Sequence, residues 1–191
     1  YKRQGAPVAV LDDDEEMFPE DVAALVKQQS ATALGTAFHR LAQRVIESRT
    51  EVGVVPELPA SAFAAQVRLG SLSQLQEKRL DEATQRWFAS DLCKRFFACE
   101  HIYAEVPFML EISSSDRPLY LEGEIDGLAV SEADKDHAFF IDYKTGGSDE
   151  ETPEQLHEKH RLQAQCYALA LIRQGFKTCL LYTSDAADDK A

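Results

Sequence analysis

Residues 120–147 read YLEGEIDGLAVSEADKDHAFFIDYKTGG and hold two apolar runs that each contain an Ile-Asp pair. The polar stretch between the runs, residues 131–136, is rich in turn-forming residues, so the segment predicts a β-hairpin. Asp is poorly suited to strands, yet Asp126 and Asp142 each follow an isoleucine directly. The two acids therefore point to a role other than strand stability.

Lys144 follows Asp142 at an offset of two residues, and alternation along a strand places both side chains on one face. Pairing of the two strands would also bring Asp126 toward Asp142, and neighbouring carboxylates repel each other unless a cation lies between them. Mg²⁺ suits such a position because it is hard, prefers oxygen ligands and bridges to phosphate. A lysine beside it can orient water or stabilise charge on phosphate. The plainer alternative is that the acids end the strands and Lys144 is their ion-pair partner.

The segments on both sides of the hairpin extend it into an α/β fold. Residues 101–110 alternate in hydropathy and predict a preceding strand, and residues 176–183 predict a final strand. One side of the first strand is expected to carry Ile102, Ala104, Val106 and Phe108. Residues 153–175 predict a helix, with a proline at its start and a glycine at its end. The inner face of this helix is expected to consist of Leu162, Cys166, Leu169 and Ala170.

The N-terminal half of the chain is predicted to be helical. Residues 30–48 carry apolar side chains at helical spacing, and residues 61–99 predict further helix with a break before Ser90, which would cap a short last helix. The apolar positions of this second region are Leu72, Leu75, Leu80, Ala83, Trp87 and Phe88. The order of helices, three strands, helix and strand predicts a central mixed β-sheet flanked by helices, with extra N-terminal helices.

The length and composition of the chain indicate how many domains it can form. Its 191 residues are 45% apolar, enough for one domain, which we expect at residues 30–183 between an acidic lead-in linker at 1–29 and an acidic tail at 184–191. The net charge of −13 disfavours a protein that coats DNA on its own, although solubility alone would also explain it.

The cysteines and the hydropathy of the chain indicate the cellular compartment in which the protein is expected. The four cysteines, Cys93, Cys99, Cys166 and Cys179, include no CxxC pair, which weakens zinc and thioredoxin-type chemistry. Buried reduced thiols are the expected alternative. No apolar run reaches 18 residues and no signal peptide is recognisable, so we expect a cytoplasmic protein without a membrane partner.

The segment GEIDGL (residues 123–128), followed by FFIDYKTG (residues 139–146), resembles the PD-(D/E)xK nuclease superfamily. Within it the sequence is most similar to the RecB-like branch, whose pattern reads G-x-[IV]-D and then D-Y-K-T-G. Three further sequence features of this branch occur in the expected order: His39 in GTAFH, Glu105 in AEVPF, and the pair Gln163 and Tyr167. The two residues of that pair lie four positions apart, on one face of a helix. The resemblance covers residues 30–183.

The resemblance implies a restriction-endonuclease-like core and metal-dependent hydrolysis of DNA. Its metal ligands would be His39, Asp126, Asp142 and the carbonyl of Tyr143, with Mg²⁺ as the expected cation and Mn²⁺ able to substitute. Its catalytic residues would be Asp126, Asp142, Lys144, Gln163 and Tyr167. For Glu105 it implies only a supporting or structural role, without a catalytic step. Because no cysteine precedes His39, the four-cysteine iron–sulfur cluster of some relatives is not expected.

The resemblance also implies partners. The chain is similar to the C-terminal nuclease domain of AddA- or RecB-type helicase–nucleases, which are ATP-dependent, exonuclease V-like enzymes of DNA recombination and double-strand-break repair. Its partners would then be single strands of DNA, a helicase domain of the same polypeptide and a second subunit. Two alternatives stay open. One is a catalytically silent module that guides DNA or docks a subunit, and the other is a stand-alone repair or phage exonuclease.

Overall fold

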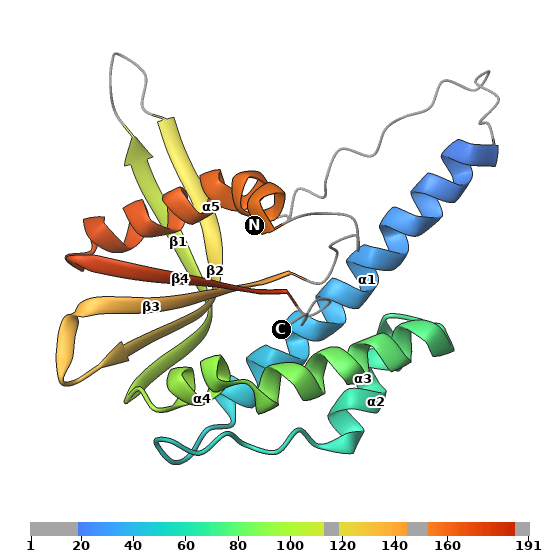
Figure 1. Ribbon diagram of the computed structural model, residues 1–191, viewed down its shortest axis with the longest axis horizontal. Coiled ribbons are helices and arrows are strands. Elements are labelled where there is room, and N and C mark those ends of the chain that lie inside the picture. The colour runs from blue at the N-terminus through green and yellow to red at the C-terminus, as the bar shows by residue number, and fades with distance from the viewer. Residues whose placement is uncertain (1–18, 113–118, 145–152, 186–191) are drawn as a thin grey trace.

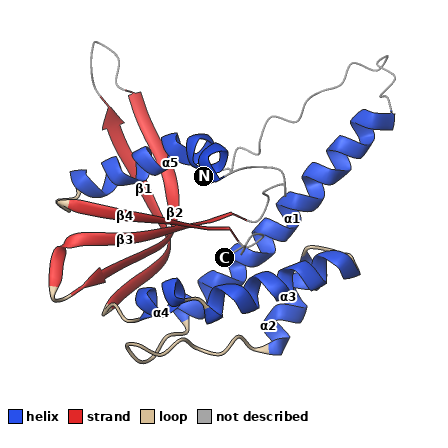
Figure 2. Cartoon of the chain, in the orientation of Figure 1, coloured by secondary structure: helices blue, strands red, loops and turns tan. Residues whose placement is uncertain are grey.

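The computed structural model describes residues 19–112, 119–144 and 153–185 (Figures 1 and 2). Its helices are α1 (Pro19–Glu47), α2 (Ala60–Leu69), α3 (Gln74–Ala89), α4 (Asp91–Phe97) and α5 (Pro153–Arg173). Its strands are β1 (His101–Ile112), β2 (Leu119–Ser131), β3 (Asp134–Lys144) and β4 (Thr178–Asp185). They form one sheet in the order β1-β2-β3-β4, antiparallel from β1 to β3, with β4 parallel to β3. The predicted mixed sheet flanked by helices is confirmed.

Helices cover the sheet on two sides. A parallel strand pair needs a crossover connection, and α5 supplies it between β3 and β4. Figure 1 shows α5 crossing the strands on one side, with α1 to α4 gathered on the other. Among the described residues, no helix has the length and apolarity that a membrane span requires.

The β2–β3 hairpin ends at the two acids that the sequence singled out. Pairing between the strands continues as far as Gly127 opposite Ile141. The next residues along the two strands are Asp126 and Asp142, while β2 goes on to pair with β1 alone. The two acids therefore lie side by side at the point where β2 and β3 separate, as the hairpin predicted.

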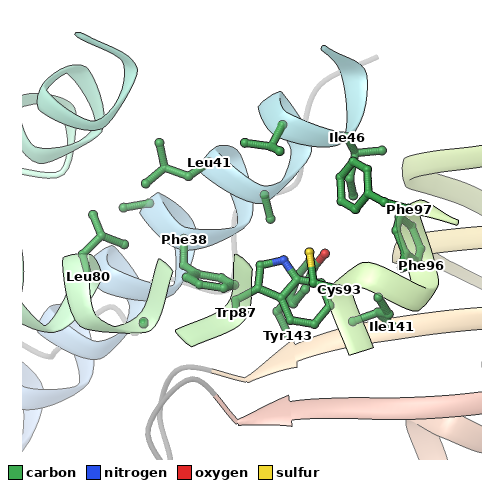
Figure 3. Packing of buried hydrophobic residues seen from close by; sticks show 14 of the residues in the cluster. Phe38, Leu41, Ile46, Leu80, Trp87, Cys93, Phe96, Phe97, Ile141 and Tyr143 are labelled. Carbon is green, nitrogen blue, oxygen red and sulfur yellow. The ribbon is translucent and has the colours of Figure 1, made fainter. Parts of the chain in front are cut away.

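The larger core lies between the sheet and helices α1, α3 and α4 (Figure 3). The ring of Tyr143 is enclosed there, with its centroid 5.3 Å from that of Phe38 and 5.2 Å from that of Trp87, both edge-to-face. The Tyr143 hydroxyl has no hydrogen-bond partner in the described part of the chain, so packing is the role of this side chain. Because Tyr143 faces this core, strand alternation turns Asp142 and Lys144 to the opposite side.

The second core lies under α5, and its composition corrects one expectation. Tyr167 and Leu171 of α5 pack with Ile125, Leu128 and Phe140 of the sheet. Leu162, which was expected to face inward, is 72% exposed, and Leu169 is 36% exposed. The inward residues are Gln163, Tyr167, Ala170 and Leu171. The apolar pattern misplaced this face because two of its four positions carry polar groups.

Strand β1 also departs from its expected alternation. Ile102 and Ala104 pack against the larger core, but Val106 and Phe108 pack against the core under α5. Between them Glu105 has a φ of 48°, in the left-handed region, and the β1–β2 pairing is interrupted there. The regular alternation of side chains along β1 is broken at this left-handed residue. The four residues therefore do not share one side.

Gly123 of the G-x-I-D motif has a packing explanation. Phe108 lies opposite it on β1, and a Cβ added at Gly123 would lie 2.7 Å from the Cζ atom of Phe108. Glycine lets the Phe108 ring cover the strand, and that ring in turn contacts Tyr167 edge-to-face, at a centroid distance of 5.7 Å. The glycine therefore helps to set the position of Tyr167.

The N-terminal helices differ from prediction at their boundaries. Helix α1 begins at Pro19, eleven residues before the predicted start at residue 30, since proline is well suited to a first helical turn. The region 61–99 is divided between α2 and α3 by a turn in which Ser71 has a φ of 49°. Leu75, one of the apolar positions of this region, is 61% exposed. The cap at Ser90 is confirmed, because its hydroxyl accepts a hydrogen bond from the N–H of Cys93.

Candidate active site

The sequence-predicted site residues come from α1, β2, β3 and α5 and meet at the point where β2 and β3 separate. They form two neighbouring groups, one that contains Asp126 and one that contains Asp142. One group, around His39, faces α1, and the other, around Lys144, faces α5. The structure therefore brings together all of the residues singled out for a metal or for catalysis. Their roles stay predictions.

His39 stands on α1 where the helix packs against β3. Its neighbour Phe38 is buried, which holds this turn of the helix against the core. The His39 Nε2 atom lies 3.2 Å from the carbonyl oxygen of Tyr143, and Nδ1 lies 3.5 Å from Oδ1 of Asp126. Burial lowers the pKa of His39, but the nearby carboxylates of Glu105 and Asp126 and the Tyr143 carbonyl outweigh it and raise the pKa above its usual value.

Asp126 is a buried carboxylate, 7% exposed, with one strong partner. Its Oδ2 atom accepts a 2.7 Å hydrogen bond from the N–H of Tyr143, which leaves Oδ1 facing His39. Burial raises the pKa of Asp126 to about 6, and the neighbouring Asp142 and Glu105 add to the rise, against the opposing effects of His39 and the Tyr143 N–H. A carboxyl group with this pKa changes charge near neutrality.

Asp142 and Lys144 begin a chain of side-chain contacts that runs onto α5. The Lys144 Nζ atom lies 2.7 Å from Oδ2 of Asp142 and donates a 2.9 Å hydrogen bond to Oε1 of Gln163. Gln163 donates in turn a 2.6 Å hydrogen bond from Nε2 to the hydroxyl oxygen of Tyr167. The lysine ammonium is thus fixed by a carboxylate on one side and an oriented amide on the other.

The donor set around His39 fits a hard divalent cation. One ligand atom from each of His39, Glu105 and Asp126 lies within 4.8 Å of the others. Oδ1 of Asp126 and Oε1 of Glu105 lie 3.5 and 3.8 Å from Nδ1 of His39. These distances fall between the separations of neighbouring and opposite corners of an octahedral Mg²⁺ or Mn²⁺ ion, about 3 and 4.2 Å. Carboxylate and carbonyl oxygens suit Mg²⁺, and one imidazole suits Mn²⁺ as well.

Solvent reaches this donor set through a groove of about 440 Å³ beside α1. The groove is lined by Gly35, Thr36, His39, Arg40, Gln43, Glu105 and Glu124. The sequence did not assign this groove, because it forms between a helix and two strands that are far apart along the chain. The groove opens His39 to the solvent.

Comparison with known proteins fits this geometry. The family model of the PD-(D/E)XK nuclease superfamily matches residues 14–184, so the chain belongs to that superfamily and is a nuclease by class. No curated protein matches the sequence. Among solved structures, a crystal structure of the protein SSO0001 is 14% identical, covers 83% of this chain and 72% of its own, and has a TM-score of 0.32, too low to carry an argument about the fold.

Glu105 lies closer to the other site residues than the sequence indicated. It was expected to have a supporting role, but its Oε1 atom lies 3.8 Å from Nδ1 of His39 and it belongs to the same group of ligand atoms as Asp126. The available signal was the acid in the stretch AEVPF. The sequence could not show that the backbone turns at this residue.

The free energy of unfolding of the metal-free protein should fall as the pH rises from about 5 to 7.5. Asp126 and His39 both have raised pKa values in the folded state. They stabilise the fold below their unfolded pKa values, and this stabilisation is lost as the pH rises through the folded ones. For Asp126, a rise from 3.8 to about 6 predicts a loss of about 1–2 kcal/mol over this range.

The measurement is urea unfolding of wild type and Asp126→Asn at both pH values with a chelator present. Asparagine keeps an oxygen for the Tyr143 N–H but cannot ionise, so the variant should show a smaller pH dependence than wild type. An equal pH dependence in the two proteins would contradict the expected ionisation of Asp126.

Proposed function

We propose that this chain is the nuclease part of an ATP-dependent helicase–nuclease of the RecB-like branch. It would hydrolyse DNA phosphodiester bonds with Mg²⁺, or with Mn²⁺ in its place, as an exonuclease V-like enzyme of recombination and double-strand-break repair in the cytoplasm. The observation that carries the proposal is the ion pair of Asp142 and Lys144, 2.7 Å long, beside the buried Asp126 where two strands separate.

The cation would be held by His39, Asp126, Asp142 and the backbone carbonyl of Tyr143. When bound, such a cation supplies positive charge that draws electrons from phosphate oxygens. Asp126 is oriented for this role by the Tyr143 N–H, and the buried Tyr143 ring fixes the position of both backbone groups of that residue.

Lys144 supplies the second positive charge of the site. Asp142 and Gln163 hold its ammonium in place, so it can orient a water molecule and stabilise the charge that develops on phosphate. The water oxygen forms the new bond to phosphorus while the bond to the 3′ oxygen breaks, which leaves a 5′-phosphate. Tyr167 acts through Gln163, because its hydroxyl fixes the amide that receives the lysine hydrogen bond.

Delivery of DNA is assigned to other parts of the enzyme. The chain has 33 acidic and 20 basic residues, a balance that gives weak attraction to a polyanion. We propose that a helicase domain of the same polypeptide, together with a second subunit, feeds single strands past the site. The acidity of the chain supports this division of labour.

The test is cleavage of labelled single-stranded DNA by wild type, Asp142→Asn and Asp136→Asn, with Mg²⁺, with Mn²⁺ and with a chelator. Asp136 is a matched control, because it lies on the same strand but is exposed and paired with Lys177. We expect metal-dependent cleavage by wild type and by the control, and a loss of roughly a hundredfold or more in Asp142→Asn. Wild-type activity in Asp142→Asn would contradict the assignment.

A further inference from the structure

Glu105 has an unusual backbone for its place in the fold. Its φ of 48° lies in the left-handed region, which L residues with a large side chain rarely adopt. Ser71, the other described non-glycine residue with a positive φ, lies in the turn between α2 and α3, where such values are ordinary. Glu105 lies within β1, opposite Asp126, at the interruption in the β1–β2 pairing.

The backbone turn directs the Glu105 carboxylate into the site. Its Oε1 atom lies 3.8 Å from Nδ1 of His39, a distance too long for a hydrogen bond. The two groups therefore face the same space and form a long ion pair when His39 is protonated. Neighbouring and opposite corners of an octahedral cation are about 3 and 4.2 Å apart, and the separation of 3.8 Å lies between these values, within reach of two ligands of one ion.

We propose that Glu105 is a further ligand of the divalent cation, contributed by β1, and that its left-handed backbone serves to place it. This inference rests on the proposed metal-dependent function, and it adds a carboxylate to the ligands that the family resemblance implies. Glu105 is partly exposed and lines the groove beside His39, so the cation reaches it directly from solvent.

A second acid in the same groove provides a matched control. Glu124 is exposed and lines the groove with Glu105, but it lies outside the group of ligand atoms formed by His39, Glu105 and Asp126. A general effect of negative charge on cation binding should appear equally in Glu124→Gln and Glu105→Gln. A direct ligand effect should appear in Glu105→Gln alone.

The experiment is calorimetric titration of Mn²⁺ into the full chain as wild type, Glu105→Gln, Glu124→Gln and Asp126→Ala, with the relaxation of water protons by bound Mn²⁺ as a second readout. We expect Glu105→Gln to weaken Mn²⁺ binding by about tenfold or more and to leave more water on the bound ion. Glu124→Gln should bind as wild type does.

A glycine variant separates the backbone from the carboxylate. Glycine adopts positive φ without strain, so Glu105→Gly should unfold at a higher temperature than wild type in the presence of a chelator, by about 2–4 °C. It should nevertheless bind Mn²⁺ as weakly as Glu105→Gln. A residue with a merely structural role would lose stability on this change.

The outcomes distinguish this inference from the proposed function. If wild type binds Mn²⁺ and Asp126→Ala does not, while Glu105→Gln binds as wild type does, the site exists and Glu105 is not a ligand. If wild type itself binds no Mn²⁺, both the proposed function and this inference are overturned. Equal weakening in Glu105→Gln and Glu124→Gln would also overturn the inference, because it would show a charge effect alone.

Discussion

Replacing Lys144 by methionine should lower the rate of DNA cleavage by roughly a hundredfold or more while leaving Mn²⁺ binding intact. Methionine keeps the length and the apolar stem of the side chain but removes the charge. A positioned charge at a reacting phosphate is typically worth about 3–4 kcal/mol in the transition state. The Asp142 carboxylate stays in place and loses a competing cation, so affinity for the metal should not fall.

The measurement is single-turnover cleavage of single-stranded DNA, with calorimetric titration of Mn²⁺ on the same preparations. Lys135→Met is the matched control, because Lys135 belongs to the same hairpin but is 68% exposed and paired with Glu132. Cleavage by Lys144→Met at the rate of the control would show that the ammonium has no part in the reaction. Loss of Mn²⁺ binding in Lys144→Met would instead show that the lysine maintains the geometry of the ligands.

Replacing Phe38 by alanine should lower the free energy of unfolding by about 3–5 kcal/mol. Phe38 is 1% exposed, and its ring meets the Tyr143 ring at a centroid distance of 5.3 Å. Its loss would leave a cavity against the residue whose carbonyl and N–H belong to the site. The backbone of Tyr143 should therefore become less constrained, and Mn²⁺ binding should weaken together with stability.

Urea unfolding followed by the fluorescence of Trp87, the single tryptophan of the chain, measures this effect, because that ring also packs on Tyr143. Leu75→Ala is a suitable control: Leu75 is 61% exposed, and its truncation should change stability by about 0.5 kcal/mol at most. A loss below about 1 kcal/mol in Phe38→Ala would contradict the described packing.

The hairpin could be predicted from sequence because its signals are local. An acid after an isoleucine, repeated on two apolar runs, and a polar turn between them predicted both the pairing and the meeting of Asp126 with Asp142, and the structure has both. The fold class and the superfamily are confirmed. The roles assigned to individual residues, the domain boundaries and the expected absence of an iron–sulfur cluster stay predictions.

The features that sequence could not give depend on contacts between distant segments. The inner face of α5 was assigned from apolar residues alone, whereas Gln163 faces inward to reach Lys144, nineteen residues earlier in the chain. The reversal of faces in β1 occurs at Glu105, whose backbone is left-handed. The early start of α1 was missed because the acidic run before Pro19 suggested an extended linker through residue 29.

The crossover connection from β3 through α5 to β4 has a consequence for the order in which the enzyme matures on the ribosome. Every proposed ligand of the cation precedes residue 145 in the chain. Gln163, whose side-chain amide accepts the hydrogen bond of Lys144, belongs to α5 and is synthesised later. A growing chain therefore has its complete ligand set before it can hold Lys144 in position. Parallel pairing between distant strands is intrinsically slow to form, so we expect Lys144 to be held in position last, after all of the proposed ligands have been synthesised.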